Sequence, residues 1–197
     1  MSEPLLFTDE GQRVNVGAHV CAMHENPSGV LGALAEAFKV GLRQDERCVY
    51  IAPEESASAV RSTLKEIGTD VEGAEKQENL LFMTDREPFL KDGVEFDPQH
   101  LVDAIKSTFE TTIEAGYAGL RLSADVPWIS HDVPGEDRIL EFEALADEVV
   151  NSPGVPLIAI CQYRLSELDP EDSIDIMERH PLTLVGGQIY TNDKYVE

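Results

Sequence analysis

The fold is decided by the stretch Gly17-Ala18-His19-Val20-Cys21-Ala22-Met23-His24-Glu25-Asn26-Pro27-Ser28-Gly29. Residues 18–24 form an apolar run of strand type, and Asn26-Pro27-Ser28 is a turn signal that ends it. From residue 29 to residue 42, apolar side chains recur at the spacing of one helix face. A strand that turns directly into a helix is the first half of a βαβ unit, so this stretch predicts a parallel sheet.

The rest of the chain repeats this alternation of strands and helices. We expect further strands at 47–52, 80–84, 120–124 and 156–163, and helices at 54–67, 97–115 and 136–150, with a short turn at 71–76 and a strand-to-helix pattern at 166–178. Residues 183–185 and 188–190 flank Gly186-Gly187, which favours a tight hairpin. The predicted fold class is α/β, a three-layer, mainly parallel sheet flanked by helices with a C-terminal β-hairpin. Residues 1–197 are expected to form one domain.

The charge of the chain is strongly negative. It contains 38 acidic and 15 basic residues, which gives a net charge of −23. Such a surface repels nucleic acid and anionic membranes, so neither is an expected direct partner. Molar salt shortens the Debye length to about 3 Å and removes most of the self-repulsion. The charge therefore predicts a halophilic protein, with an acidic mesophilic protein as the alternative.

The lack of targeting signals and the spacing of the cysteines restrict the class of protein further. No apolar run approaches the roughly 20 residues that span a bilayer, and residues 1–7 lack the basic region of a signal peptide. We therefore expect a cytoplasmic protein. Cys21, Cys48 and Cys161 are widely spaced and odd in number, which argues against a disulfide framework. No CxxC or HExxH motif is present, so no metal site is predicted, and the cofactor is left open.

Candidate site residues are sought first at the carboxyl ends of the strands, where open parallel sheets bind ligands. The period of two places His19, Cys21 and Met23 on one face of the first strand and His24 on the other. A site at this edge could combine His24 with Asp125, Trp128 and Tyr163. The full set of candidate ligand-binding residues is His19, Cys21, His24, Asp125, Trp128, Cys161, Tyr163 and His180.

Structural roles compete with this interpretation. Cysteines in strands usually pack in the core, single histidines are often structural, and His180 could simply fix the turn before Pro181. Glu141 and Glu143 fall on a predicted helix, where we expect solvent exposure. Two chemical alternatives also stay open. Cys21 and Cys161 with His19 and a further ligand could hold a metal, or a cysteine could act as a nucleophile beside a histidine base.

The order of the elements matches the core of a P-loop NTPase, that is, a RecA-like layout. A working phosphate loop has the pattern GxxxxGK followed by Ser or Thr. The corresponding residues 25–34 contain no lysine, and Glu25 adds negative charge. Asp125 occupies the place of a Walker B aspartate. This degenerate P-loop predicts no NTP hydrolysis and a protein that is not an enzyme.

At these residues the chain resembles the MEDS domain, a sensory domain described in methanogen and methylotroph proteins. Residues 17–25 are similar to the family pattern G-x-H-x-C-x-x-Y-E, and further matches are Gly116–Arg121, the Trp128 loop, Glu141-Phe142-Glu143, Cys161-Gln162-Tyr163 and His180–Gly187. The resemblance covers about residues 15–196. His24 stands where the family usually has tyrosine, which changes hydrogen bonding and ligand shape there.

This resemblance implies a RecA- or KaiC-like fold without a standard Walker A loop. It also implies sensing of a small molecule, such as a hydrocarbon derivative, beside histidine-kinase or DNA-binding modules. We therefore expect a non-catalytic ligand-binding domain that signals through a separate histidine kinase or transcription regulator, and a homo-oligomer is compatible with the fold. A sensing domain predicts a preformed, partly apolar pocket. A scaffold module predicts an exposed apolar patch instead, and a thiol or metal enzyme predicts a cysteine close to a histidine.

Overall fold

A computed structural model of the chain describes residues 5–6, 13–14, 17–26, 28–84, 89–125 and 133–196. Its centre is a seven-stranded sheet with the order β5-β4-β6-β7-β3-β8-β9. These strands are β3 (Ala18–His24), β4 (Arg47–Ile51), β5 (Leu80–Met83), β6 (Leu120–Asp125), β7 (Leu157–Arg164), β8 (Leu182–Val185) and β9 (Gln188–Thr191). All neighbouring pairs are parallel except β8 and β9, which form the predicted C-terminal hairpin. A separate antiparallel pair joins β1 (Leu5–Leu6) to β2 (Arg13–Val14).

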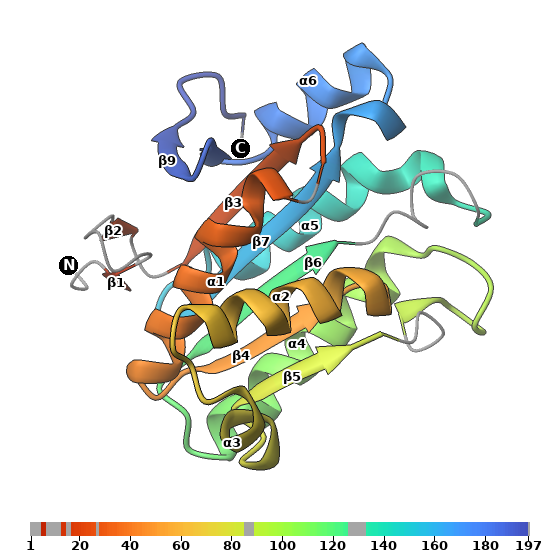
Figure 1. Cartoon of the computed structure of the whole chain (residues 1–197). Helices are drawn as coiled ribbons and strands as arrows, with labels where there is room; N and C mark the ends of the chain where they lie inside the picture. Colours follow the sequence, from red (N-terminus) through yellow and green to blue (C-terminus); the bar gives the residue numbers. More distant parts are fainter. Residues whose placement is uncertain are drawn as a thin grey trace.

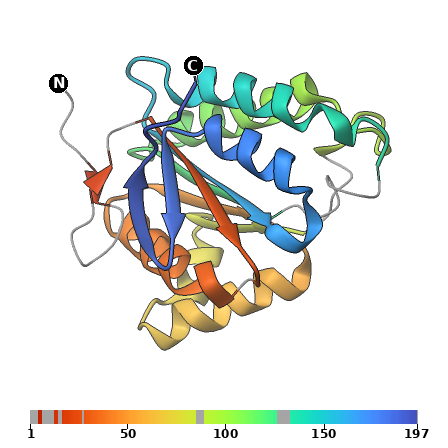
Figure 2. The same ribbon diagram turned by 90° about the horizontal axis from the view of Figure 1, so that it is seen from above.

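Helices cover both faces of the sheet and give the predicted three layers (Figure 1). One face carries α1 (Ser28–Arg43) and α2 (Glu54–Glu66), with α3 (Val71–Lys76) beside β5. The opposite face carries α4 (Pro98–Glu114) and α5 (Ile139–Val150), and α6 (Pro170–Glu178) lies next to α5 (Figure 2). No helix among the described residues is both long and apolar enough to cross a membrane.

The alternation of side chains along the strands builds a separate core on each face. In β3, Val20 and Ala22 pack in the core under α1 and α2. Cys21 lies in a small cluster on the opposite face, which also contains Ile176 of α6, with Met23 packed against it. The predicted alternation along the first strand is therefore confirmed. Because helices cover both faces of the sheet, six of the seven residues of β3 are buried.

Local sequence signals set most element boundaries. Asp97 is the N-cap of α4, since its Oδ1 accepts the backbone N–H of His100 at 2.9 Å, and Pro98 is the first helical residue. Gly186 and Gly187 have φ values of 56° and 82°, as a tight hairpin turn requires.

The segments at 136–150 and 166–178 each open with a 3₁₀ turn before the α-helix begins. The helix predicted from residue 136 starts with a 3₁₀ turn, Glu136–Arg138, and becomes α-helical only at Ile139. In the segment 166–178, a 3₁₀ turn (Leu165–Glu167) precedes α6, which starts at Pro170. Proline lacks a backbone N–H and is tolerated in the first turn of a helix, so α6 begins there.

A buried ion pair ties β6 to the start of β4. The Arg121 side chain is fully buried, and its Nε and Nη2 atoms donate to the Glu46 carboxylate at 2.7 and 3.1 Å. Its Nη1 donates to the carbonyl of Ala37 in α1 at 2.7 Å. A Cβ atom at Gly41 would lie 2.9 Å from Cys48 Sγ and 3.0 Å from Arg121 Nε, so glycine is needed where α1 crosses this pair.

Candidate functional site

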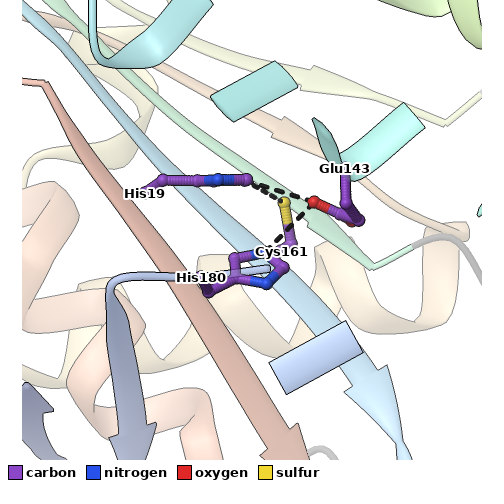
Figure 3. A group of neighbouring side chains, drawn as sticks. All are labelled: His19, Glu143, Cys161 and His180. Atoms are coloured by element: carbon purple, nitrogen blue, oxygen red, sulfur yellow. Dashed lines mark hydrogen bonds and ion pairs between the residues drawn. The ribbon is translucent and has the colours of Figure 1, made fainter. Parts of the chain in front are cut away.

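Four side chains with metal-ligating or acid–base groups converge on the face covered by α5 and α6. His19, Glu143, Cys161 and His180, the ligand cluster, point toward one another, and one atom of each lies within 4.8 Å of the others (Figure 3). His19 Nε2 lies 3.3 Å from Glu143 Oε2 and 3.5 Å from Cys161 Sγ, and His180 Nε2 lies 3.1 Å from Glu143 Oε2. Three of the four residues are fully buried, and Cys161 is 9% exposed.

The sheet register explains how residues distant in sequence meet. In the parallel pair of β3 and β7, His19 is opposite Ala159 and Cys21 is opposite Cys161. His19 and Cys161 therefore share a face and are diagonal neighbours. Glu143 comes down from α5, and His180 comes from the turn between α6 and β8. The cluster lies over the interior of the sheet and not at the carboxyl edge, where candidate residues were sought first.

A second layer of polar groups orients the cluster. His19 Nδ1 lies 3.0 Å from Asp147 Oδ1, and His180 Nδ1 donates to the carbonyl oxygen of Ile176 at 2.8 Å. The Tyr163 hydroxyl donates to Glu143 Oε1. Because both Nδ1 atoms are engaged, both Nε2 atoms face the centre of the cluster.

The two histidines and the carboxylate shift one another's proton affinity. Burial alone would raise the pKa of Glu143, but the neighbouring His180 and His19 hold that pKa at about 2. Burial and the charge of His19 act to lower the pKa of His180, yet the Glu143 carboxylate raises it to about 9. Burial likewise acts to lower the pKa of His19, and its anionic neighbours raise it well above its usual value. Without a bound cation, the cluster is a proton-sharing network around a buried carboxylate.

An apolar cavity adjoins the cluster beneath α4 and α5. It offers about 40 Å³ to the centre of a water-sized molecule, where about 10–15 Å³ is enough for one water. Leu122, Phe142 and Ala159 line it, and His19 and Cys161 form the part of the wall that the cavity shares with the cluster. The arrangement can therefore hold a small apolar molecule beside nitrogen, oxygen and sulfur ligands.

His24 and Asp125 lie on the other face of the sheet. Asp125 is opposite Gln162, and His24 is opposite Arg164, whereas Tyr163 points to the α5 side. Asp125 accepts hydrogen bonds from Ser56 Oγ at 2.7 Å and Arg164 Nη2 at 3.3 Å. The predicted combination of His24 and Asp125 with Tyr163 is therefore wrong, because the register between the strands places Tyr163 on the opposite face of the sheet. Trp128 lies outside the described residues.

Two acidic residues of the site were not predicted from the sequence. Glu143 was expected to be exposed, but its side chain is fully buried at the centre of the cluster. Asp147, one helical turn later in α5, was not considered. Both follow the four-residue spacing that places side chains on one helix face. That spacing, together with Phe142 and Ala146 in the core, was the signal that could have found them.

Cys21 and Cys48 have packing roles in the described structure. Both side chains are fully buried. Burial raises the pKa of Cys48 to about 12, and burial together with nearby Glu143 raises the pKa of Cys21 well above its usual value. Neither thiol belongs to the ligand cluster.

The fold and the site define a RecA-like α/β domain with a buried polar cluster. A KaiC-like protein from Pyrococcus horikoshii has a similar structure, with a TM-score of 0.62 and 17% identity over 93% of this chain and 80% of that one. The flagellar accessory protein FlaH from Methanocaldococcus jannaschii matches with a TM-score of 0.54 and 12% identity over 88% and 75% of the two chains. These similarities confirm the predicted RecA-like fold class.

The chain belongs to the MEDS family, the methanogen/methylotroph, DcmR sensory domain, whose model matches residues 18–181. A curated relative, the transcriptional repressor DcmR of Methylorubrum extorquens, is 26% identical over 164 residues. The match covers 82% of this chain and 57% of the repressor. The predicted family resemblance is therefore confirmed, and the chain is a member of a family of sensory domains.

Proposed function

We propose that this domain senses a small apolar molecule, of the class of short hydrocarbon derivatives, and passes the signal to a transcription regulator. The observation that carries the proposal is the apolar cavity whose wall includes His19 and Cys161. Membership of a sensory family and similarity to a transcriptional repressor support the regulatory role. The net charge of −23 supports DNA contact through a partner rather than through this surface.

The size of the cavity limits the ligand and its affinity. Room of about 40 Å³ fits a molecule with one or two carbon atoms. The best small ligands gain about 1.5 kcal/mol per non-hydrogen atom, so three such atoms supply at most about 4.5 kcal/mol. That ceiling corresponds to a Kd in the millimolar range. A sensor of this kind suits a ligand that reaches high concentrations.

The contacts of the cluster supply a route for the signal. His180 follows α6 directly, and Asn192 holds that turn by donating to the carbonyl oxygens of Met177 and His180 at 2.7 and 3.0 Å. Near the C-terminus, the Tyr195 hydroxyl donates to Asp147, which also contacts His19. A ligand that shifts the cluster therefore shifts the segment that includes β8 and β9. We propose that the partner reads this segment.

The test is a titration of the full chain with dichloromethane and, separately, xenon, followed by ¹H–¹⁵N NMR. We expect saturable shifts around Phe142 and Ala159. Ala146→Leu fills the cavity from α5 and is expected to weaken binding by at least about tenfold, since a blocked site forfeits most of a 4 kcal/mol interaction. Ala144→Leu in the same helix faces the outer groove and is the matched control. Equal binding by both variants would rule out this cavity as the site.

A second candidate function is thiol chemistry, favoured by one observation. Cys161 Sγ lies 3.5 Å from His19 Nε2, and Asp147 contacts the other ring nitrogen of His19, the arrangement of an activated nucleophile. With chloromethane, the sulfur would bond to carbon, chloride would leave, and His19 would take the thiol proton. Intact-mass analysis distinguishes the two functions. A methyl adduct on Cys161 supports thiol chemistry, and an unmodified mass with reversible NMR shifts supports sensing.

A further inference from the structure

The ligand cluster presents the donor atoms of a transition-metal site. Its four inward-facing atoms are two imidazole nitrogens, one carboxylate oxygen and one sulfur, from His19, His180, Glu143 and Cys161. Four ligands of these types are the usual number for zinc. The ligands come from β3, α5, β7 and the turn after α6. Such a site leaves no local spacing motif in the sequence.

Two of these atoms form no hydrogen bond of regular geometry among the described residues, although they lie within ion-pair distance of one another. They are Glu143 Oε2 and His180 Nε2, which are buried and 3.1 Å apart. Buried polar atoms in native proteins nearly always have a partner, and an exception calls for an explanation such as a bound ion. Both atoms point to the centre of the cluster (Figure 3). An ion between them would satisfy both.

The surrounding groups are those that accompany metal-binding histidines. Such histidines almost always donate their second ring N–H to a carboxylate or a backbone carbonyl. His19 has Asp147 and His180 has the carbonyl of Ile176 in these positions, at 3.0 and 2.8 Å. Tyr163 binds Glu143 Oε1, which leaves Oε2 for the centre. The geometry is therefore preorganised beyond the four ligands themselves.

We propose that the cluster binds one divalent transition-metal ion of the Zn²⁺ or Fe²⁺ class, held by His19 Nε2, His180 Nε2, Glu143 Oε2 and Cys161 Sγ. Imidazole and thiolate select such ions, whereas Ca²⁺ and Mg²⁺ require shells of oxygen. The charges also balance, since the thiolate and the carboxylate neutralise a divalent cation. This inference goes beyond the sensing function and does not depend on it.

Asp147 lines a surface groove on the outer side of the site. This groove, of about 580 Å³, is lined by Asp147, Asn151, Arg179 and Tyr195. Asp147 connects this groove to His19, and its side chain is 13% exposed. The carboxylate can therefore meet a cation at the surface while it contacts a ligand of the buried site.

The experiment uses the full chain, stripped with chelator and titrated with Zn²⁺ and, as a spectroscopic probe, Co²⁺. We expect one equivalent to bind and Co²⁺ to give a thiolate charge-transfer band in the near ultraviolet. Cys161→Ser is expected to abolish the band, and Cys48→Ser, in the other core, is expected to keep it. His180→Gln is expected to weaken Zn²⁺ binding by at least about tenfold, since metal sites lose that much even from outer-shell changes.

X-ray absorption of the Zn²⁺-loaded wild-type protein needs no variant to fold. It is expected to show one sulfur at about 2.3 Å and nitrogen or oxygen neighbours at about 2.0–2.1 Å. Absence of stoichiometric binding, a shell without sulfur, or a Co²⁺ band that survives Cys161→Ser would overturn the proposal. The first of these outcomes would leave the four residues as a proton-sharing network. Ligand binding in the cavity is measured separately, so either proposal can fail alone.

Discussion

His19 Nδ1 lies 3.0 Å from Asp147 Oδ1, and this contact decides which nitrogen of the imidazole faces Glu143 and Cys161. The same carboxylate accepts the hydroxyl of Tyr195, near the C-terminus. One side chain of α5 therefore connects a strand near the start of the chain with its last described segment.

Asp147→Ala is expected to weaken Zn²⁺ binding by about 10–100-fold, because the ring of His19 loses the group that orients it. Isothermal titration of the chelator-stripped protein measures this change. The matched control is Glu148→Ala, the neighbouring position on α5, whose side chain is exposed. A loss of the same size in both variants would show that general charge, and not orientation, sets the affinity.

Removing Glu46 is expected to destabilise the fold strongly. Glu46→Leu leaves the fully buried Arg121 without its carboxylate, which costs about 3–5 kcal/mol in the free energy of unfolding. The double variant with Arg121→Met is expected to recover most of that loss. Urea unfolding measures both. Glu141→Ala removes a half-exposed partner of Arg138 and is expected to change the free energy of unfolding little, so a similar cost at both sites would contradict this account.

The stability of the fold is expected to depend on His24 below pH 6.5. Burial lowers the pKa of His24, and the charges of Asp125, Arg164 and Glu167 act on it with mixed signs. The unfolded chain therefore binds the proton more readily than the folded protein. The contribution of His24 to the free energy of unfolding is therefore fully present above pH 6.5. It is lost as the pH falls from there through the lowered pKa of the folded protein.

Thermal unfolding of wild type and His24→Tyr from pH 7.5 to pH 5 tests this sign. The variant is expected to lose less stability on acidification, because tyrosine does not titrate in this range. His100→Gln, on α4, controls for the loss of a histidine elsewhere. Parallel curves for wild type and His24→Tyr would show that His24 is not responsible.

The charge of −23 predicts that salt stabilises the protein. Between 0.1 M and 1 M salt the Debye length falls from about 10 Å to about 3 Å, so repulsion between surface carboxylates is screened. We expect the melting temperature to rise by several degrees in KCl. The variant Glu110→Lys/Glu114→Lys, with two changes on exposed positions of α4, is expected to be more stable than wild type at low salt only. A salt-independent melting temperature would contradict the halophilic interpretation.

Most of the fold could be predicted because its signals are local. The strand at residues 18–24, the cap formed by Asp97 and Pro98, and the Gly186-Gly187 hairpin each depend on neighbouring residues. The late start of α5 was missed because the helical pattern continues into the 3₁₀ turn that precedes it. The spacing of apolar residues does not show where the hydrogen bonding changes from 3₁₀ to α-helical.

The site could be predicted only in part. His19, Cys161, Tyr163 and His180 were among the candidates, and the structure brings them together. Glu143 was not recognised, because one buried carboxylate is not distinguishable among 38 acidic residues by composition. His24 was grouped with Tyr163 because the face that a side chain occupies depends on register between strands, and a single sequence does not contain that register.

The position of His180 has a consequence for how the protein is made. His180 is translated long after His19, and Asn192, which donates to the carbonyl oxygen of His180, is translated later still. The cluster therefore cannot be complete on a nascent chain, however early the first strands pair. Whatever occupies it can be enclosed only after His180 and the turn that carries it have been translated and have folded.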